Sequence, residues 1–342
     1  MGKHYLITGG AGFIGCNYTA HLIESGQDVT IFDNLSRQGT ESNLAWLKTK
    51  YGEHAFKFVH GDIRNLEALK NVIPDADIIL HLAAQVAVTT SVTNPREDFE
   101  INALGTFNVL EAARMVGNDP ILLYASTNKV YGGMEKVRVA ADDKQYYYED
   151  FPQGISEKQP LDFHSPYGCS KGTGDQYMRD YHRIYGLRTV VFRQSCIYGT
   201  RQFGVEDQGW VAWFIIAAQL GRPITIYGDG KQVRDILFVS DLCRAYDAAI
   251  KSIDVASGQI FNIGGGPTNT LSIWEQFGPM LEKHLRSTIP ITRSDWRPGD
   301  QPIYVSDIRK AEQLLNWTPK INSREGIEVL FNWVKENKEL FQ

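Results

Sequence analysis

The sequence predicts an α/β protein built on a doubly wound parallel sheet, with a smaller mixed α/β domain attached to it. Short apolar runs rich in β-branched residues alternate with amphipathic stretches over residues 1–130, and runs of this kind suit parallel strands that are buried on both faces. The chain of 342 residues is also longer than the roughly 250 to 300 residues at which a single core stops growing. A large domain carrying a smaller one is therefore expected.

Each element of the sheet follows from its local pattern. Strands are expected over 4–8, 28–33, 56–62, 77–83 and 120–126, and helices over 13–25 and 99–116. A long helix over 167–185 stops at Gly186 and is followed by a strand over 189–193. Strand-helix-strand repetition implies right-handed crossovers, and hence helices on both faces of the sheet.

The alternation weakens after about residue 196 into loops rich in Gly, Pro and Trp. A helix over 241–252 and a strand over 259–265 still resemble late parts of the first sheet. We therefore expect one domain formed by 1–195 plus 239–265, and a discontinuous second domain formed by 196–238 plus 266–342.

Composition excludes several classes of function. The apolar and charged fractions, 43% and 22%, are ordinary for a globular protein, and a formal charge of -5 argues against an electrostatic partnership with nucleic acid. The N-terminal apolar run is too short for a signal peptide, and no stretch is long enough for a membrane span, so a cytoplasmic protein is expected. Four scattered cysteines without a C-x-x-C pair predict reduced packing thiols and no metal site.

A glycine-rich turn, TGGAGFIG, directly follows the first strand and opens a helix. Gly9, Gly12 and Gly15 let the backbone turn tightly and approach a pyrophosphate, whose charge is favoured by the free amides of the helix start. Asp33 ends the second strand, where a carboxylate can bind a ribose diol, which favours NAD over NADP; Arg37 nearby weakens that inference. A turn-capping role for Asp33 is the alternative.

Tyr167 and Lys171 stand four residues apart in SPYGCSK at the start of the long helix, so their side chains face the same way. A neighbouring ammonium and a nicotinamide cation both favour the phenolate, so we expect a lowered pKa for Tyr167 and a role as proton acceptor from a substrate hydroxyl. An ordinary surface pair is the alternative. The expected cofactor contacts are Gly9, Gly12, Phe13, Ile14, Gly15, Asp33, Asn34, Asp62, Ile63, Leu82, Ala83, Ala84, Gln85, Tyr167 and Lys171.

With TGGAGFIG, HLAAQ, STNKVYG and YGCSK, the chain resembles the extended short-chain dehydrogenase/reductase family almost from end to end. Members of this family are mostly nucleotide-sugar epimerases, dehydratases and reductases. The resemblance implies a Rossmann domain for NAD, with a second domain for the nucleotide sugar. In the family, the Ser or Thr three residues before VYG binds the reacting hydroxyl, and here that residue is Thr127. The resemblance therefore implies that Thr127, Tyr167 and Lys171 form the catalytic set.

The two residues after Thr127 limit which of the family's reactions the site could catalyse. The family's 4,6-dehydratases carry Asp and Glu there, an acid and a base for eliminating water, whereas this chain has Asn128 and Lys129. Neither side chain can serve as that acid or that base. The remaining reactions are removal and return of a hydride, or net reduction of the substrate. This row, the long segment 133–164, and the stretches RQFGVEDQGWVAWF, GDGKQVRD and FNIGGG resemble the family's 2-epimerases of CDP-linked hexoses.

That resemblance implies a redox-neutral epimerisation at C2 of a CDP-hexose through a transient 2-keto sugar, with a CDP-sugar as the partner molecule. RPGDQ at 297–301 instead follows the general family pattern and leaves the sugar open. A 4-epimerase or 4-ketoreductase of another nucleotide sugar is the first alternative. A non-catalytic nucleotide-binding protein is the second.

Arginine suits a diphosphate because its guanidinium binds phosphate oxygens in a fork. Arg234 in KQVRD and Arg297 in DWRPGD match the family's diphosphate-binding arginines. His164 could reach the sugar or simply cap a turn. The expected substrate contacts are Asn128, Lys129, His164, Ser195, Arg201, Gln202, Arg234 and Arg297. Gln208, Trp210 and Trp213 could stack or hydrogen-bond near the base or sugar, but a Trp-rich amphipathic helix is more often part of the core, so they are not included among the expected contacts.

Two further expectations concern the surface. Tyr146–Tyr148 lacks periodicity and is interpreted as an ordered loop or flap near the active site, with an exposed partner-binding patch as the alternative. In the family, the long helices that begin here near Phe99 and Tyr167 pack against their symmetry mates, which implies a homodimer or homotetramer.

Overall fold

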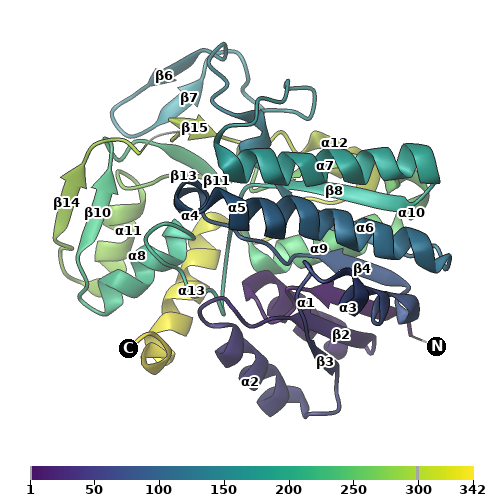
Figure 1. The fold of residues 1–342 in the computed structure, drawn as a ribbon. Coiled ribbons are helices and arrows are strands. Elements are labelled where there is room, and N and C mark those ends of the chain that lie inside the picture. Colours follow the sequence, from purple (N-terminus) through teal and green to yellow (C-terminus); the bar gives the residue numbers. More distant parts are fainter. Residues whose placement is uncertain (1, 298–299) are drawn as a thin grey trace.

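A seven-stranded parallel sheet forms the centre of the computed structural model, which describes residues 2–297 and 300–342 (Figure 1). The α/β class predicted from the alternating pattern is confirmed. The strand order is β12-β8-β5-β4-β1-β2-β3. These strands are β1 (His4–Thr8), β2 (Asp28–Asp33), β3 (Lys57–His60), β4 (Ile78–His81), β5 (Ile121–Thr127), β8 (Arg188–Gln194) and β12 (Ile260–Ile263).

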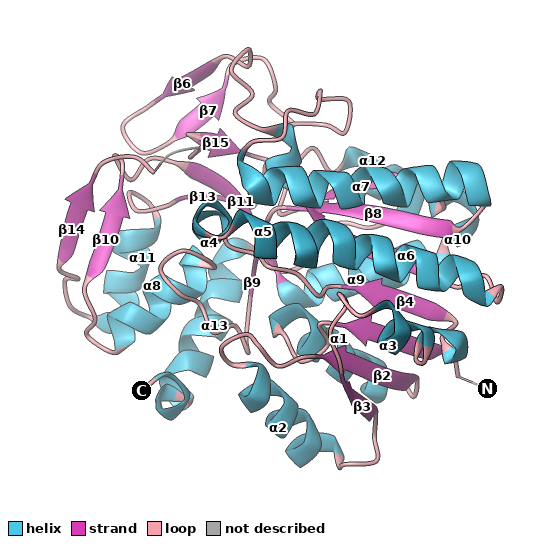
Figure 2. Ribbon diagram, in the orientation of Figure 1, coloured by secondary structure: helices cyan, strands magenta, loops and turns pink. Residues whose placement is uncertain are grey.

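Successive residues of each strand point to opposite faces of this sheet, and both faces are covered (Figure 2). Leu6, Ile79 and Leu122 pack with α3, α6 and α7 on one face, whereas Ile7 and Leu123 pack with α1 and α9 on the other. All five residues are buried, as the continuous apolar runs predict. The helices involved are α1 (Phe13–Glu24), α3 (Leu66–Lys70), α6 (Gly105–Val116), α7 (Ser165–Tyr185) and α9 (Val239–Lys251).

Shorter helical elements complete this part of the molecule. They are α2 (Thr40–Tyr51), η1 (Ile73–Asp75), α4 (Val88–Thr93), α5 (Pro95–Asp98), η2 (Phe99–Leu104), η3 (Asn128–Tyr131), α10 (Ile253–Ala256) and α12 (Arg309–Leu315). The helix expected over 99–116 is thus in two parts, because its first six residues form the π-helical turn η2.

A second hydrophobic cluster lies beside the large sheet, where Phe214, Phe277 and Leu330 meet (Figure 1, left). Its helices are α8 (Trp210–Gln219), α11 (Phe277–Leu285), α13 (Ser323–Glu336) and η4 (Lys338–Phe341). The strands of this part of the molecule are β9 (Cys196–Tyr198), β10 (Ile224–Tyr227), β11 (Val233–Phe238), β13 (Thr270–Ser272), β14 (Ile291–Ser294) and β15 (Ile303–Tyr304), of which β15 packs in a separate cluster with Tyr131 and Tyr148. Strand β11 pairs with β9, β13 and β15, and β10 pairs with β14.

The tyrosine segment is a strand rather than a loop. Tyr146–Tyr148 forms β7, which pairs antiparallel with β6 (Val139–Ala141). Tyr148 is buried and its hydroxyl donates to the Ile303 carbonyl oxygen at 3.0 Å. Within residues 2–297 and 300–342, no helix combines the length and apolar character that crossing a bilayer requires.

The order of the strands determines where a ligand can bind. The chain leaves β1 toward β2 on one side and returns to β4 on the other, so the connections diverge at the carboxyl ends of β1 and β4. Parallel sheets bind ligands in the crevice at such a point. The strand ends that meet this edge carry Thr8, Asp33, His81, Thr127 and Gln194.

Candidate active site

The glycine turn is closed by backbone hydrogen bonds and has no room for side chains. The amide of Gly12 donates to the Gly9 carbonyl oxygen at 3.1 Å. A Cβ on Gly9 would lie 2.6 Å from the Ala83 nitrogen, and one on Gly15 would lie 2.3 Å from the Gly9 oxygen. No side chain caps the start of α1 at Gly12, so the first amides of the helix remain available to an anion. These features fit the pyrophosphate of a dinucleotide.

Asp33 lies at the carboxyl end of β2 beside this turn. Its carboxylate accepts hydrogen bonds from the amides of Ala11 at 3.0 Å and Leu35 at 2.8 Å. Burial raises its pKa, whereas these two hydrogen bonds oppose that effect. Asp33 also lines the cavity described below. The turn-capping and ribose-binding roles are therefore compatible at this position.

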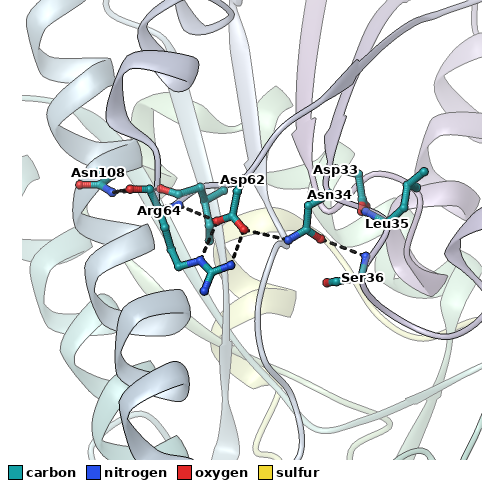
Figure 3. A network of polar contacts seen from close by, with 8 residues as sticks. Asp33, Asn34, Leu35, Ser36, Asp62, Arg64 and Asn108 are labelled. Carbon is teal, nitrogen blue, oxygen red and sulfur yellow. Dashed lines mark hydrogen bonds and ion pairs between the residues drawn. The ribbon is translucent and has the colours of Figure 1, made fainter.

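A polar network fixes the next strand end (Figure 3). The Asn34 amide donates to the Asp62 carboxylate at 2.9 Å, and Arg64 binds the same carboxylate through two hydrogen bonds of 3.0 and 2.7 Å. The Arg64 guanidinium lowers the pKa of Asp62 to about 2, so this group is ionised at neutral pH. Asn108 donates to the Arg64 carbonyl oxygen at 3.1 Å, which anchors the network to α6.

These elements surround a first cavity of about 220 Å³. Every predicted cofactor contact except Gln85 lines it. The Gln85 amide instead donates to the Ala87 carbonyl oxygen at 2.8 Å and to Asp98 at 2.9 Å, so the prediction for this side chain lacks support from its position. Lining residues absent from the prediction include Phe32, Ser36, Thr40, Asn43, Val86, Ile101, Gln194 and Phe203.

Tyr167 and Lys171 face the same cavity from the first turns of α7. Both are almost fully buried, with 9% and 4% of their surfaces exposed. The Lys171 ammonium lies 4.2 Å from the centre of the Tyr124 ring, which favours the charged form. Burial nevertheless lowers the pKa of Lys171 to about 7, against the attraction of Asp175 and Asp98.

The groups of the protein itself do not lower the pKa of Tyr167, so that part of the prediction is wrong. Burial raises the pKa of this phenol to about 12. A hydrogen bond with Thr127 acts in the opposite direction but is outweighed. Removing a phenolate from water disfavours it more than the surrounding protein groups favour it.

A second cavity, of about 400 Å³, meets the first at Tyr167. Thr127, Asn128 and Lys129 line this second cavity only, from the end of β5 and from η3. Burial, and next the charge of Arg234, lower the pKa of Lys129 to about 8. The phenol therefore stands where one cavity, shaped for a dinucleotide, opens into another that is lined by hydroxyl, amide and ammonium groups.

Two arginines line the far part of the second cavity. The Arg234 guanidinium lies 3.6 Å from the Asp300 carboxylate. Arg297 lies over the Tyr227 ring, 3.8 Å from its centre, and 3.2 Å from the Asp207 carboxylate. Both positions suit an anionic group of a ligand that reaches Tyr167 from this side.

The remaining predicted substrate contacts divide into two groups. Ser195 and Gln202 line the second cavity. His164 lies outside both cavities, 3.1 Å from Asp162, with 49% of its side chain exposed. Arg201 lines the first cavity rather than the second, and its guanidinium lies 4.4 Å from the centre of the Trp46 ring. Neither His164 nor Arg201 therefore lines the second cavity.

Several residues of the second cavity were absent from the prediction. Trp210 and Gln208, for which both a ligand contact and a core position were considered, line this cavity. The signal that could have identified them is their position just before and at the start of α8, after a loop rich in polar residues. Other lining residues include Val86, Val88, Thr89, Cys196, Glu206, Asp207, Phe214, Thr225, Tyr227, Ile273 and Asp300. Pro298 and Gly299 of the RPGDQ segment lie outside the described residues.

A protein-family model described as GDP-mannose 4,6 dehydratase matches residues 6–330. The chain belongs to the extended short-chain dehydrogenase/reductase family. It is 45% identical to a CDP-paratose 2-epimerase of Salmonella typhi over 335 residues, which cover 96% of this chain and 98% of that protein. Members of the family are NAD-dependent nucleotide-sugar epimerases and dehydratases, and this chain is an enzyme of that group.

Solved structures of the family share the fold. A dTDP-glucose 4,6-dehydratase from Streptomyces venezuelae with NAD bound is 28% identical, with a TM-score of 0.84 over 99% of each chain. A UDP-glucuronic acid 4-epimerase from Bacillus cereus, in complex with UDP-glucuronic acid and NAD, is also 28% identical, with a TM-score of 0.82 over 97% of this chain and 99% of that one. NAD is the cofactor of the family, and the first cavity fits it.

Proposed function

We propose that this protein is an NAD-dependent 2-epimerase that interconverts CDP-paratose and CDP-tyvelose, with CDP-glucose and CDP-mannose as a second pair of substrates. The 45% identity with the Salmonella typhi CDP-paratose 2-epimerase, over almost the full length of both chains, carries the proposal. The residues of the second cavity support it, because Asn128 and Lys129 stand where a dehydratase of this family needs an acid and a base.

The first cavity would hold the cofactor. The glycine turn and the amides of α1 would bind the pyrophosphate, Asp33 the adenosine ribose, and Lys171 the nicotinamide ribose. When bound, NAD accepts a hydride from a substrate carbon and returns it later. A carboxylate at Asp33 would repel a 2'-phosphate, which accounts for a preference for NAD over NADP.

The proton is moved by Tyr167. The phenolate accepts the proton of the C2 hydroxyl as the C2–H bond breaks, which leaves a ketone at C2, and the phenol gives the proton back when the new C2–H bond forms on the opposite face. Thr127 holds the reacting oxygen from the end of β5. A charged Lys171 one helical turn away would favour the phenolate, against burial, which raises the pKa of Tyr167.

The second cavity would hold the nucleotide sugar. Arg234 and Arg297 bind the two phosphates, and Asn128 and Lys129 orient the sugar. Because the diphosphate is held while the ketone turns, either face of C2 can be presented to the cofactor. We extend the proposal to the domains: 1–195 plus 239–265 bind NAD, and 196–238 plus 266–342 bind the nucleotide part of the substrate.

The test is incubation of the purified protein with CDP-paratose, with no added NADH or NADPH, followed by NMR of the nucleotide sugar. We expect a mixture of CDP-paratose and CDP-tyvelose. The relatives that act at C4 make inversion at C4 of a UDP-sugar the second candidate, so UDP-glucose and UDP-glucuronate are tested in parallel. Product formation only from a UDP-sugar, or only with an added reductant, would contradict the proposal.

The variant Tyr167→Phe separates catalysis from binding. We expect it to retain NAD and bind CDP, because only one oxygen is removed, while epimerisation falls by at least about a hundredfold. Unchanged activity in this variant would favour a protein that binds nucleotides without using Tyr167 for chemistry.

A further inference from the structure

Asp98 is a carboxylate for which the proposed function has no role. It ends α5 and has no exposed surface. Its Oδ1 accepts hydrogen bonds of 2.9 Å from the side-chain amides of Gln85 and Asn102. Its Oδ2 accepts no hydrogen bond of normal geometry from the described residues. Burial raises the pKa of Asp98, and the neighbouring Ser170, Asn102 and Gln85 side chains act in the opposite direction. A buried carboxylate with one oxygen unsatisfied is costly, so its presence requires a reason.

The surroundings of Asp98 indicate what that reason is. The chain continues from Asp98 into the π-helical turn η2, a feature that is rare and common near functional sites. Both α5 and η2 pack against α7, the helix that carries Tyr167, Ser170 and Lys171. The charge of Asp98 acts on both Lys171 and Tyr167, as expected for a buried carboxylate on an element packed against the helix that carries them.

The other carboxylate that acts on Lys171, Asp175, has the larger effect on its pKa but is also paired with a cation of its own. Asp175 accepts two hydrogen bonds from Arg193, at 2.9 and 2.8 Å, and one from the Ser126 hydroxyl at 2.7 Å. Asp98 has no such partner in its hydrogen-bond network, which consists of two neutral amides, and Lys171 is the cation that acts on it. The unbalanced negative charge beside Lys171 is therefore that of Asp98.

Other ionisable groups around this pair do not take over that role. Burial lowers the pKa of His81 to about 3, so its imidazole is neutral and cannot balance either charge. Arg37 acts on Tyr167 from the far side of the cofactor cavity. The remaining charged groups on the same segment project to the surface or its edge, namely Arg96, Glu97 and Glu100.

We propose that Asp98 is a positioning residue that holds Lys171 in its charged form beside Tyr167. This inference rests on the proposed function, because it assigns Lys171 and Tyr167 their catalytic roles. Gln85 and Asn102 then have a role as well: they fix Oδ1 and leave the charge of Oδ2 directed at α7. Gln85, which was predicted to contact the cofactor, thus holds Asp98 instead.

The variant Asp98→Asn tests the charge while it keeps the hydrogen bonds, because an asparagine oxygen can still accept from Gln85 and Asn102. Catalysis requires a protonated Lys171 and a deprotonated Tyr167. Loss of the negative charge of Asp98 lowers the pKa of both groups. Both limbs of the pH profile of kcat/KM should therefore move to lower pH, the alkaline limb by about one pH unit. A purely structural role would lower the activity at every pH without moving the limbs, and that result would overturn the proposal.

The control is Glu97→Gln, which removes the neighbouring negative charge from an exposed position of the same helix. We expect its pH profile to match that of the unmodified enzyme. An equal shift in this variant would mean that any charge on α5 has the same effect, and would contradict a specific pairing of Asp98 with Lys171.

A stability measurement keeps the proposal testable if no sugar is turned over or if Asp98→Asn is poorly active. We expect Asp98→Asn to lower the midpoint of thermal unfolding of the NAD-bound enzyme. In a protein that also carries Lys171→Met, Asp98 is a buried charge without a cation, so there we expect Asp98→Asn to raise the midpoint. Equal changes in the two backgrounds would show that the residues are not coupled. This result does not depend on which nucleotide sugar is the substrate.

Discussion

Arg193 and Asp175 form an ion pair of two hydrogen bonds, 2.9 and 2.8 Å long, between β8 and α7, with 3% and 0% of their side chains exposed. The same carboxylate accepts the Ser126 hydroxyl from β5, next to Thr127. One buried pair therefore ties together the strand that carries Thr127 and the helix that carries Tyr167.

Breaking this pair should destabilise the protein strongly. Arg193→Met leaves Asp175 charged and buried without a partner, which costs about 3 to 5 kcal/mol of the free energy of unfolding. Urea unfolding at neutral pH measures this loss. Arg138→Met is the control, since Arg138 pairs with Asp150 at the surface, and its loss should leave the urea midpoint nearly unchanged. Equal losses in the two variants would contradict the account.

The glycine turn should not tolerate a methyl group. A Cβ at Gly15 meets the Gly9 carbonyl oxygen, a backbone atom that cannot move without opening the turn. We expect Gly15→Ala to lower the free energy of unfolding by about 1 to 3 kcal/mol and to purify without NAD. Cofactor content is measured by absorbance after denaturation. Gly133→Ala should retain NAD, because its Cβ would lie 3.6 Å from the nearest side-chain atom.

The outer face of α6 and α7 should be covered in solution. Phe107 and Tyr177 are exposed there with their rings 5.7 Å apart, and Ile184 lies on the same helix as Tyr177 with 65% of its surface exposed. Contiguous apolar surface of this kind marks an interface. We expect Tyr177→Glu to reduce the mass measured by light scattering to that of a monomer. Val329→Glu, on α13, should leave the mass of the oligomer unchanged.

The pair of His21 and Asp247 should make stability depend on pH. Their side chains approach to 2.6 Å, and this hydrogen bond raises the pKa of His21. The stabilisation is fully present below the unfolded pKa of about 6.5 and is lost as the pH rises through the higher folded value. Both groups are over a third exposed, so the effect is below about 1 kcal/mol.

We therefore expect His21→Gln to flatten the fall of the thermal midpoint between about pH 6 and pH 8. His54→Gln, in an exposed turn, should keep the slope of the unmodified protein. An unchanged slope in His21→Gln would mean that this pair does not contribute.

Local sequence carries most of the information about the large sheet and the cofactor cavity. Strands buried on both faces must be continuous apolar runs, and a turn that a Cβ would disrupt must be glycine, so β1, the glycine turn and Asp33 are recognisable without a structure. Tyr167 and Lys171 are recognisable for a similar reason, because their spacing and their helix are both local.

Tertiary packing decides what local sequence does not reveal. Tyr146–Tyr148 has no alternation, and its strand forms only because Val139–Ala141 pairs with it. Asp98 follows Pro95 in a charged stretch that reads as solvent-exposed, and only the packing of α5 against α7 buries it. The pKa of Tyr167 differs from expectation for the same reason, since burial is a property of the folded molecule.

The central claim is that the hydrogen removed from C2 of the sugar is the one returned to it. CDP-paratose carrying deuterium at C2 is incubated with the NAD-bound enzyme in ordinary water, and the CDP-tyvelose formed is examined by mass spectrometry and NMR. Retention of the deuterium at C2 of the product is the predicted result. Replacement of that deuterium by hydrogen from the solvent would contradict the account.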